Sequence, residues 1–592
     1  METNKNNIGI PRFPSKHDQD IVDESLMEFS QLQTWRSVFA GQWEEVASLV
    51  LPTSRNTFFY SSYNFPGQKR TDRQIDASGM MANQKFSAIL DSLLTPKNLM
   101  WHGLESPDEY VMKDRATRLW FEQVTKILFK YRYMPIANFT SQNHTNFLQL
   151  GAFGTHGMFI DEFDNTLHPG QRGLRYKSIP IGELFIRENH QGVVDGFIRW
   201  FRLTARQAYQ KWGDSGHFPE VLRPALENNS ETLFNFIHRV CPRTDYEQGR
   251  IDEKGKPYAS YYISMEGKCL LSEGGYRMIP ASISRYEQAP GEVYGRSPAM
   301  MVLPALKTLN AQKRTFLKVG HRAADPVLLT ADDGIVDASL RPGALNKGGM
   351  SADGKPLIGV LPTGNIQTTL EMMNEEKGLI NDAFLVNLFQ MSLEMKDMPQ
   401  MTATQVIEIT NQKGILIAPT VGGQNDYLAT MIERELDVLS SQGLLPPMPP
   451  RLKEAGGDYR VVFTNPMQKA MKAQEASGFM RTLEVVKELV NITQDQSLLD
   501  PFDFDTAIPA IADIQSVPAS WMSDDDSIAK KRQSRAQAQA RQQQVQEAPA
   551  QAAIMKAKAA MLKAGGGGGQ APVSPGQLPA QGGAPLAEQI AQ

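Results

Sequence analysis

Residues 291–326 read GEVYGRSPAMMVLPALKTLNAQKRTFLKVGHRAADP, and this stretch decides the fold. Its apolar residues recur at helical spacing, which predicts a helix over 297–325. Pro298 and Pro304 shorten that helix, because proline lacks the amide hydrogen that an inner helical turn requires. Residues 326–365 then alternate short apolar pieces with Gly/Pro turns, which indicates a compact β excursion.

The chain after this excursion returns to helical spacing. Residues 366–390 predict a second helix, and the Met-rich segment MSLEMKDMPQM (391–401) is expected to be a loop, because it keeps no helical period. A long helix opens at TATQVIEI (402–409), where a threonine hydroxyl can cap the first turn. We expect Pro419 and Gly422–Gly423 to break this helix before it resumes.

The two helices on either side of the excursion carry opposite charges. At 100° per residue, four cations of the first helix fall within about 60° of each other and a fifth lies nearby. These residues, the basic stripe, are Lys307, Arg314, Lys318, His321 and Arg322. The carboxylates of the second helix are Glu371, Glu375, Glu376 and Asp382. The stripe is either a solvated, salt-bridged face or a surface beside a polyanion. Neighbouring copies of the chain could pair the two helices.

Composition limits the class of protein. The chain has 592 residues, which predicts two to four domains, and a formal net charge of only −4, which does not indicate a general nucleic-acid binder. Cys241 and Cys269 are its only cysteines, so the sequence supports neither a disulfide framework nor a zinc site. The N-terminus lacks an apolar signal core and no run of about 18 apolar residues occurs, so we expect no membrane span.

The first 290 residues predict an α+β fold. Helical spacing indicates helices over 23–51, 72–94, 111–130 and 138–150. From Gly151 the apolar residues alternate and are often β-branched or aromatic, which indicates strands over 151–163, 174–189, 192–204, 234–242 and 258–271. A short helix begins at Thr204, and we expect residues 276–292 to be irregular.

The last part of the chain loses its apolar residues. RVVFTNP (460–466) predicts a strand, and residues 468–490 predict a helix. Residues 526–592 are rich in Gln and Ala, with one basic run from Lys530 to Arg541, and then in Gly and Pro. This composition buries no core, so we expect the tail to be disordered, as we also expect of residues 1–20.

The sequence contains no convincing catalytic motif. GMSADGK (349–355) begins like a phosphate-binding loop, but Pro356 stands where a hydroxyl must reach magnesium, so a turn-rich hairpin tip is the better interpretation. The nine histidines are scattered without metal-ligand spacing. Asp500, Asp503 and Asp505 could hold a metal, although loop solvation or helix capping explains them better.

The Met-rich segment has two interpretations. Its methionines either fill a core, since methionine packs adaptably, or belong to a mobile loop at a lumen. Pro399 and the flanking charges argue against a buried core helix. The candidate loop residues are Met391, Glu394, Met395, Lys396, Asp397, Met398 and Met401.

Over about residues 30–525 the chain resembles the portal, or head-to-tail connector, family of short-tailed (podovirus-type) bacteriophages. The segments that carry the resemblance are WEEVASLVLP (43–52), TDRQIDASGMMANQKFSAILDSLLTPKNLMWHGL (71–104), GAFGTHGMFIDE (151–162), GEVYGRSP (291–298), RPGALNKG (341–348) and MTATQVIEI (401–409). None is a catalytic signature, and their order and spacing together are more specific than any one segment.

The resemblance implies a portal-type α+β subunit with named parts. These are a flexible N-terminus (1–20), an α/β wing (21–296), a two-helix stem (297–325 and 366–390), a small β-containing clip (326–365), a channel loop (391–402), a long kinked helix with its return to the wing (403–467), a helical crown (468–525) and the tail (526–592). Stem candidates for the DNA channel or subunit contacts are Lys307, Lys313, Arg314, Lys318 and Arg322. Clip candidates for docking are Arg341, Asn346, Lys347 and Lys355.

The resemblance also implies partners and a location. Such subunits form a ring, usually of twelve, at one capsid vertex of the virion, after assembly in the host cytoplasm. Double-stranded DNA passes through the ring without sequence preference during packaging and ejection. The clip docks the large terminase subunit and later the tail adaptor, and capsid and scaffolding proteins are further partners. Neither a cofactor nor an ATPase activity is implied. Charge reversal at Lys313 or Arg314 is expected to disturb assembly or packaging more than wing folding.

Two other classes of protein stay open on the residues alone. One is a metal-dependent enzyme acting on nucleic acid through Asp500–Asp505, which loss of cleavage on changing these aspartates would favour. The other is a connector or adaptor without a DNA channel, which a ring lacking an open lumen would favour.

Overall fold

The computed structural model describes most of the chain between Lys16 and Ala564. The described residues are 16–54, 57–58, 71–163, 170–213, 218–330, 339, 341–347, 349–361, 366–387, 403–464, 466–493, 502–504, 507–508, 511–512, 521, 523 and 525–564. The chain divides into two units, Met1–Ala519 and Ser520–Gln592.

Helices dominate the first unit up to Phe153. They are α1 (Lys16–Leu49), α2 (Ser78–Leu94), α3 (Glu109–Met112), α4 (Arg115–Arg132) and α5 (Phe139–Phe153), with a 3-10 turn at Pro52–Ser54. The four predicted helices are confirmed, but the third is interrupted, because Asp114 accepts the backbone N–H of Thr117 at 3.1 Å and caps the start of α4. The short strand β1 (His102–Glu105) was not predicted.

Two antiparallel sheets follow, as the alternating pattern predicted. The smaller has the strand order β3-β2-β9, and the larger is the meander β4-β5-β6-β7-β8. The strands are β2 (Thr155–Glu162), β3 (Leu174–Ile179), β4 (Leu184–Glu188), β5 (Val194–Thr204), β6 (Leu233–Pro242), β7 (Tyr258–Ser264), β8 (Cys269–Tyr276) and β9 (Ala281–Arg285). The fold is therefore a mixture of helices and antiparallel sheets.

Two predictions about the sheet boundaries were wrong. Residues 276–292 are not irregular throughout, because β9 pairs with β2, with Met158 opposite Ser282. A five-residue strand that depends on a partner more than a hundred residues away leaves little local signal. The strand expected from Gly151 begins instead at Thr155, because α5 continues to Phe153 and ends at Gly154.

The helix predicted at Thr204 is confirmed as α6 (Ala205–Trp212). The Thr204 hydroxyl accepts the backbone N–H of Gln207 at 3.3 Å, and the Gln207 side chain accepts the backbone N–H of Thr204 at 3.1 Å, which forms a capping box. The elements nearby that were not predicted are α7 (Arg223–Asn228) and the 3-10 turns Ile181–Glu183, Glu220–Leu222 and Glu253–Gly255.

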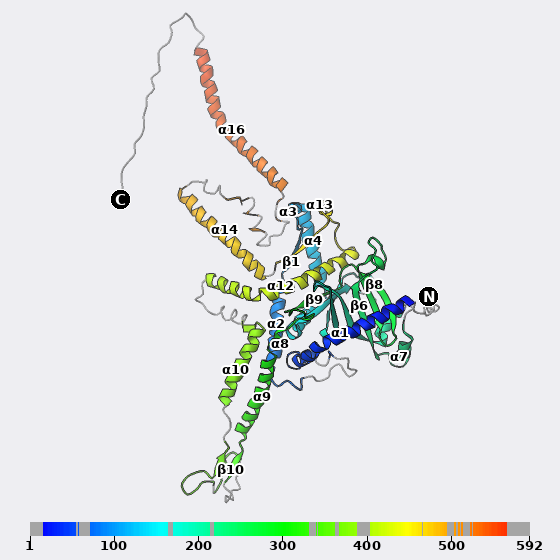
Figure 1. Cartoon of the computed structure of the whole chain (residues 1–592). Coiled ribbons are helices and arrows are strands. Elements are labelled where there is room, and N and C mark those ends of the chain that lie inside the picture. Colours follow the sequence, from blue (N-terminus) through cyan, green and yellow to red (C-terminus); the bar gives the residue numbers. More distant parts are fainter. Residues whose placement is uncertain are drawn as a thin grey trace, which may run out of the picture. The chain divides into compact units, whose positions relative to one another are not determined.

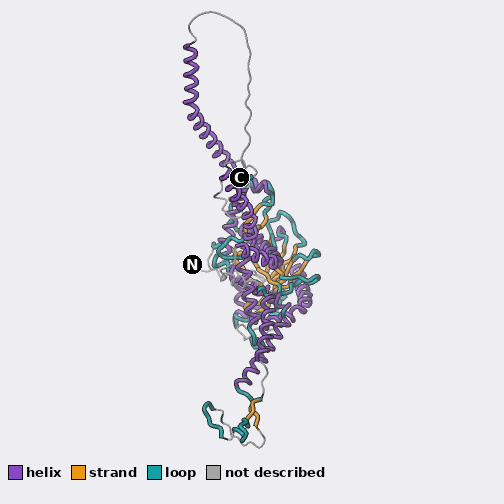
Figure 2. The backbone as a smooth tube through the Cα atoms, turned by 90° about the vertical axis from the view of Figure 1, so that its left-hand side faces the viewer, coloured by secondary structure: helices purple, strands orange, loops and turns teal. Residues whose placement is uncertain are grey.

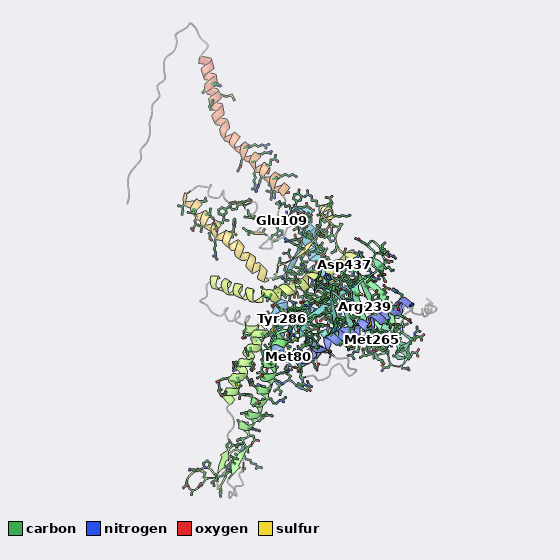
Figure 3. The ribbon with its side chains drawn as sticks, in the orientation of Figure 1. Met80, Glu109, Arg239, Met265, Tyr286 and Asp437 are labelled. Atoms are coloured by element: carbon green, nitrogen blue, oxygen red, sulfur yellow. The ribbon has the colours of Figure 1, made fainter. Side chains whose placement is uncertain are left out.

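Helix α1 packs against the larger sheet (Figure 1). Phe29 of α1 and Phe185 of β4 meet edge to face, with ring centres 4.9 Å apart. Arg239 of β6, labelled in Figure 3, pairs with Glu24 at 2.8 Å and with Glu28 at 2.6 Å, both on α1. These pairs allow a buried guanidinium to remain charged beneath the helix.

Helices α5 and α12 (Ala403–Ser441) both pack on the smaller sheet. Their side chains meet at His156 of β2: the ring centre of Tyr427 lies 4.6 Å and that of Phe147 6.3 Å from the imidazole. Asn146 Nδ2 donates to Tyr427 Oη at 3.2 Å and joins the two helices directly. The main core therefore combines segments far apart in the sequence.

A helical hairpin leaves this core and carries a small strand pair (Figures 1 and 2). Its elements are α8 (Pro298–Met301), α9 (Leu303–Ala324), β10 (Leu328–Thr330), β11 (Ile358–Val360) and α10 (Ile366–Ala383). Strands β10 and β11 form an antiparallel ladder of three residue pairs. The predicted order of helix, β excursion and helix is confirmed.

Helix α12 is continuous, which corrects the predicted break at Pro419 and Gly422–Gly423. The next turns bury Val421, Tyr427 and Leu428 in the main core. We attribute the continuity to this packing, which offsets the hydrogen bond that Pro419 cannot donate.

The remaining elements of the first unit are α13 (Pro450–Glu454), β12 (Arg460–Phe463) and α14 (Pro466–Thr493). The predicted strand β12 is confirmed and pairs with β1, with His102 opposite Phe463. Within the described part of the chain, no helix is both long and apolar enough to cross a membrane.

The second unit contains the helix α16 (Asp525–Ala564). The prediction that residues 526–592 are disordered throughout was therefore wrong for this stretch. Ala, Gln, Lys and Arg are among the residues of highest helix propensity, so the stretch can form a helix without burying an apolar face.

Three buried histidines make the stability of the first unit sensitive to mild acid. Burial lowers the pKa of His156 to about 4, and burial also holds the pKa values of His102 and His238 well below the usual value of 6.5. The unfolded chain therefore binds more protons than the folded chain as the pH falls from 6.5 toward 4, and stability falls with it.

We expect the free energy of unfolding, measured in urea at pH 7, 6 and 5, to decrease as the pH falls, with a slope that approaches about 1.4 kcal/mol per pH unit below pH 6.5 for each histidine that stays neutral in the fold. Replacing the exposed His190 by asparagine is the control, because it removes an imidazole that is not buried. A stability that does not change between pH 7 and 5 would contradict the assignment of three neutral buried imidazoles.

Candidate functional site

Helices α9 and α10 lie side by side and form the candidate site (Figure 1). Each helix has one apolar side: Leu306 and Leu309 of α9 and Met373 and Ile380 of α10 are buried in the main core, with Phe316 partly buried against it. At 100° per residue these positions occupy one side of each helix. The other sides of both helices are largely exposed and carry charge.

Hydrogen bonds fix the base of α9 to the sheet-bearing part. Ser297 Oγ donates to the carbonyl oxygen of Ala152 at 2.8 Å, and the N–H of Gly295 donates to Thr155 Oγ1 at 2.8 Å. Further along α9, Asn310 Oδ1 accepts the N–H of Ile75 at 2.8 Å. The direction in which the hairpin leaves the core is thus set within a single chain.

Gly154 lies at the base of α9, where two backbone segments approach each other closely. Its φ is 73°, in the left-handed region, and a Cβ there would lie 2.5 Å from the backbone carbon of Arg296 and 2.5 Å from the carbonyl oxygen of Gly295. We expect Gly154→Ala to lower the free energy of unfolding in urea by about 2–4 kcal/mol, because the backbone must shift as well as accept strain.

Gly320→Ala is the matched control for Gly154→Ala. Gly320 lies inside α9, and apart from its chain neighbours and the backbone of its own helix, no atom lies within 4 Å of the position that an alanine methyl group would take. Alanine is therefore expected to stabilise the chain by about 0.5–1 kcal/mol through helix propensity. Equal stability of the two variants would show that the close approach at Gly154 does not limit the fold.

Part of the predicted basic stripe forms an exposed face of α9. Arg314, Lys318 and Arg322 are exposed and project away from the side that holds Leu306 and Leu309. No carboxylate of the described residues forms an ion pair with any of the three. We call these three residues the outer basic face.

The other two stem candidates already have contacts within the chain. Lys307 Nζ lies 2.6 Å from a carboxylate oxygen of Glu45 on α1, although both side chains are about half exposed, so the pair contributes about 0–1 kcal/mol. Lys313 lies on a different side of α9, with its ammonium 5.4 Å from the centre of the Phe316 ring. The predicted candidates therefore do not form a single surface.

Helix α10 has a matching acidic face. Glu371, Glu375 and Asp382 fall within about 40° of each other, on the side opposite Met373 and Ile380. These three residues are the outer acidic face, and Glu376 lies outside it. Among the described residues, no ion pair joins α9 to α10. The hairpin therefore presents opposite charges on its two helices without neutralising them internally.

The segment between α9 and α10 ends in an exposed tip. Arg341, Lys347 and Lys355 are exposed there, whereas Asn346 braces the loop by accepting the N–H of Ser339 at 2.9 Å and donating to its carbonyl at 3.1 Å. Large apolar side chains are exposed beside them; they are Val327, Leu329, Leu345, Met350, Val360 and Leu361. A mixture of cations and exposed apolar side chains is typical of a surface that binds another protein.

The segment GMSADGK, which begins like a phosphate-binding loop, forms a hairpin turn, as the sequence predicted. Ser351 N–H donates to the carbonyl of Lys355 at 2.8 Å, Gly354 has a φ of 76°, and Met350 bridges to Pro356. The next helix begins only at Ile366, too far away to direct its amides at a phosphate.

Two sets of sequence candidates lie outside the described residues. One is the whole predicted channel loop, with Met391, Glu394, Met395, Lys396, Asp397, Met398 and Met401. The other is the pair Asp500 and Asp505, whereas Asp503 is described. Within the described part of the chain, no group of three His, Cys, Asp or Glu side chains is arranged to hold a metal ion.

A buried polar cluster, which the sequence interpretation missed, fixes α12 to the rest of the unit. Arg132 of α4 donates to both carboxylate oxygens of Glu435 of α12, at 3.1 and 2.5 Å. Tyr176 of β3 donates to the same carboxylate at 2.6 Å, and Arg132 also donates to His102 Nε2 at 2.8 Å. All four side chains are almost wholly buried. The sequence feature that could have revealed this cluster is Glu435, an acidic residue at a core position of α12, one helical turn after Met431.

The protonation states of this cluster follow from burial and charge. Burial alone would lower the pKa of Arg132, but the Glu435 carboxylate outweighs it, so the pKa is raised and the guanidinium stays charged. Burial and the neighbouring Glu435 raise the pKa of Tyr176 well above its usual value. Burial and then Arg132 lower the pKa of His102, which suits a neutral imidazole accepting a hydrogen bond. The cluster is therefore one ion pair with two neutral partners.

Comparison with known proteins agrees with the resemblance seen in the sequence. The family described as bacteriophage head to tail connecting protein matches residues 22–522. A match over most of the chain shows that it belongs to this family.

Named relatives agree with this assignment. The chain is 27% identical over 532 residues to the portal protein of Salmonella phage epsilon15, and 26% identical over 529 residues to the probable portal protein of Bordetella phage BPP-1. Each alignment covers 87% of this chain and 91% of the relative. A chain from a native gene transfer agent virion matches over 69% of this chain and 85% of its own length, at 10% identity and a TM-score of 0.34, which is too low to compare folds in detail.

Proposed function

We propose that this chain is the subunit of a phage portal ring, which sits at one capsid vertex of the virion and through which DNA is packaged and later ejected. The family match over residues 22–522 and the two portal-protein relatives support this function. They give no support to the alternative of a nucleic-acid-processing enzyme, and the proposed role is structural rather than catalytic.

The observation that supports ring formation is the separation of opposite charges on the two helices of the hairpin. The outer basic face of α9 and the outer acidic face of α10 are not paired with each other within the chain. In a cyclic arrangement, one helix of each subunit would meet the other helix of its neighbour, so a single heterologous contact repeats and closes. Met372 and Leu379 are exposed beside the acidic face and would be covered in the same contact.

The segments then have distinct proposed roles. Residues 297–325 and 366–390 form the stem, 326–365 the clip, 391–402 the channel loop and 468–525 the crown. In this proposal the ring has twelve subunits, and double-stranded DNA crosses its lumen without sequence preference. The exposed tip around Arg341, Lys347 and Lys355 would dock the large terminase subunit and later the tail adaptor. Capsid and scaffolding proteins would contact the ring as it assembles in the host cytoplasm.

Electron microscopy of the purified full-length protein tests the proposal. Closed rings with an open centre in views down the axis are the expected result, and the same images count the subunits. Rings without a lumen would favour an adaptor. Monomers or compact dimers across a range of concentrations would overturn the portal proposal, and a metal-dependent nuclease assay would then test the enzyme alternative.

A further inference from the structure

Helix α16 has an unusual charge for this chain. It contains eight Lys or Arg against three Asp or Glu, a formal net charge of +5 in a protein whose total is −4. Five of these cations lie between residues 530 and 541, a segment without a carboxylate. They are Lys530, Lys531, Arg532, Arg535 and Arg541, and all five are exposed. We call residues 530–541 the basic segment.

The basic segment is not suited to packing on a protein core. Its other residues are Gln, Ser and Ala, so it has no apolar stripe to bury. In sequence, the nearest acidic residues precede the segment, at Asp525 and Asp526. The segment therefore offers an excess of exposed positive charge to an external polyanion.

The distribution of the five cations around the helix distinguishes the kind of polyanion. At 100° per residue they spread over about 200° of the circumference, within a length of about 17 Å. A flat acidic surface would meet only one side of such a helix. The major groove of duplex DNA, about 12 Å wide, admits a helix and places phosphates along both of its sides. The serine and alanine side chains between the cations would leave room for this close approach.

We propose that the basic segment of α16 binds the phosphate backbone of double-stranded DNA without sequence preference, in or across the major groove. The cations contact phosphates, and glutamine and serine side chains add hydrogen bonds to phosphate oxygens. This goes beyond the portal function, because a ring with a lumen requires no DNA-binding element outside its stem. It is a property of the second unit that does not depend on the number of subunits.

Duplex binding by the full-length protein tests this inference. The variant K530Q/K531Q/R532Q/R535Q/R541Q removes the charge and keeps residues of similar helix propensity. Its control, K85Q/K130Q/R451Q/R481Q/K487Q, removes the same charge from exposed positions of the first unit. Fluorescence anisotropy with a labelled duplex of about 30 base pairs, between about 50 and 200 mM salt, gives the affinity and its salt dependence for both variants.

We expect the α16 variant to bind about tenfold or more weakly than the wild type at about 100 mM salt. Its slope of log affinity against log salt should fall by as much as about 4.5, since each phosphate contact contributes about 0.9. The control variant should retain most of the duplex affinity and most of its salt dependence. Equal losses in the two variants would overturn the inference, because they would indicate general charge rather than the segment.

Unchanged duplex affinity would also overturn the inference, and retained binding to an acidic polypeptide such as polyglutamate would then indicate a protein partner. Far-ultraviolet circular dichroism confirms that the helix content of the variant is unaltered. Electron microscopy of the same preparations separates this inference from the portal proposal, because rings that lose DNA binding leave the portal function standing.

Discussion

Replacing Glu435 by glutamine is expected to lower the free energy of unfolding of the first unit by about 3–5 kcal/mol. Glutamine can still accept the hydrogen bond from Tyr176, but it brings no negative charge to Arg132. The fully buried guanidinium would then lose the only carboxylate that the described structure places on it, 2.5 Å away. Urea unfolding of the full-length protein, followed by tryptophan fluorescence, measures the change.

Two companion variants make this prediction specific. Glu433→Gln makes the same substitution on the same helix at a partly exposed position and is expected to change stability by less than about 0.5 kcal/mol. Combining Glu435→Gln with Arg132→Met removes both charges and should recover part of the loss, because no uncompensated charge remains buried. If the double variant is less stable than Glu435→Gln alone, the loss comes from packing and not from the orphaned guanidinium.

Reversing the outer basic face, with Arg314→Glu and Lys318→Glu together, is expected to reduce the yield of closed rings by about tenfold or more. Both side chains are exposed in the single chain, so the folding of the sheet-bearing part should change by less than about 0.5 kcal/mol. In a ring the new carboxylates would face the neighbour's acidic face, and like charges brought together at an interface cost several kcal/mol. Sedimentation velocity and electron microscopy give the ring fraction.

A charge swap provides the stronger test of this contact. Adding Glu371→Lys and Glu375→Lys to the reversed α9 restores opposite charges across the proposed interface, and rings should return. Lys85→Glu with Lys130→Glu makes the same change in net charge on α2 and α4 and should leave ring formation intact. Normal rings in the Arg314/Lys318 variant would remove α9 from the subunit contact.

Local pattern was enough to predict much of this fold. The amphipathic spacing of α2 and α4, the alternation of β5 and β6, and the threonine cap of α6 are all signals contained within a few neighbouring residues. The helical hairpin and its β excursion were predictable for the same reason, because Gly and Pro mark the excursion clearly.

The errors arose where distant contacts outweigh local preference. Proline alone argues for a break at Pro419, and only the packing of Tyr427 and Leu428 accounts for a continuous α12. Strand β9 exists because β2 pairs with it. At the candidate site, the sequence predicted the charges of both helices, but it did not show that Lys307 contacts Glu45 or that Lys313 lies over Phe316. The ion pair between Arg132 and Glu435, which are 303 positions apart, had no local signal except that Glu435 is an acidic residue at a core position of α12.

The strand pair β10–β11 has a consequence for successive docking. A ladder of three residue pairs, with both strands largely exposed, is too small to be stable by itself. Its amide hydrogens should exchange with solvent within seconds in the free subunit and slow markedly once a partner covers the tip. A tip that acquires its final order from each partner can match two different surfaces in turn. The tip then binds each partner with lower affinity, because it loses conformational entropy every time a partner orders it. In the proposed function, this lower affinity would make it easier for the second partner to replace the first.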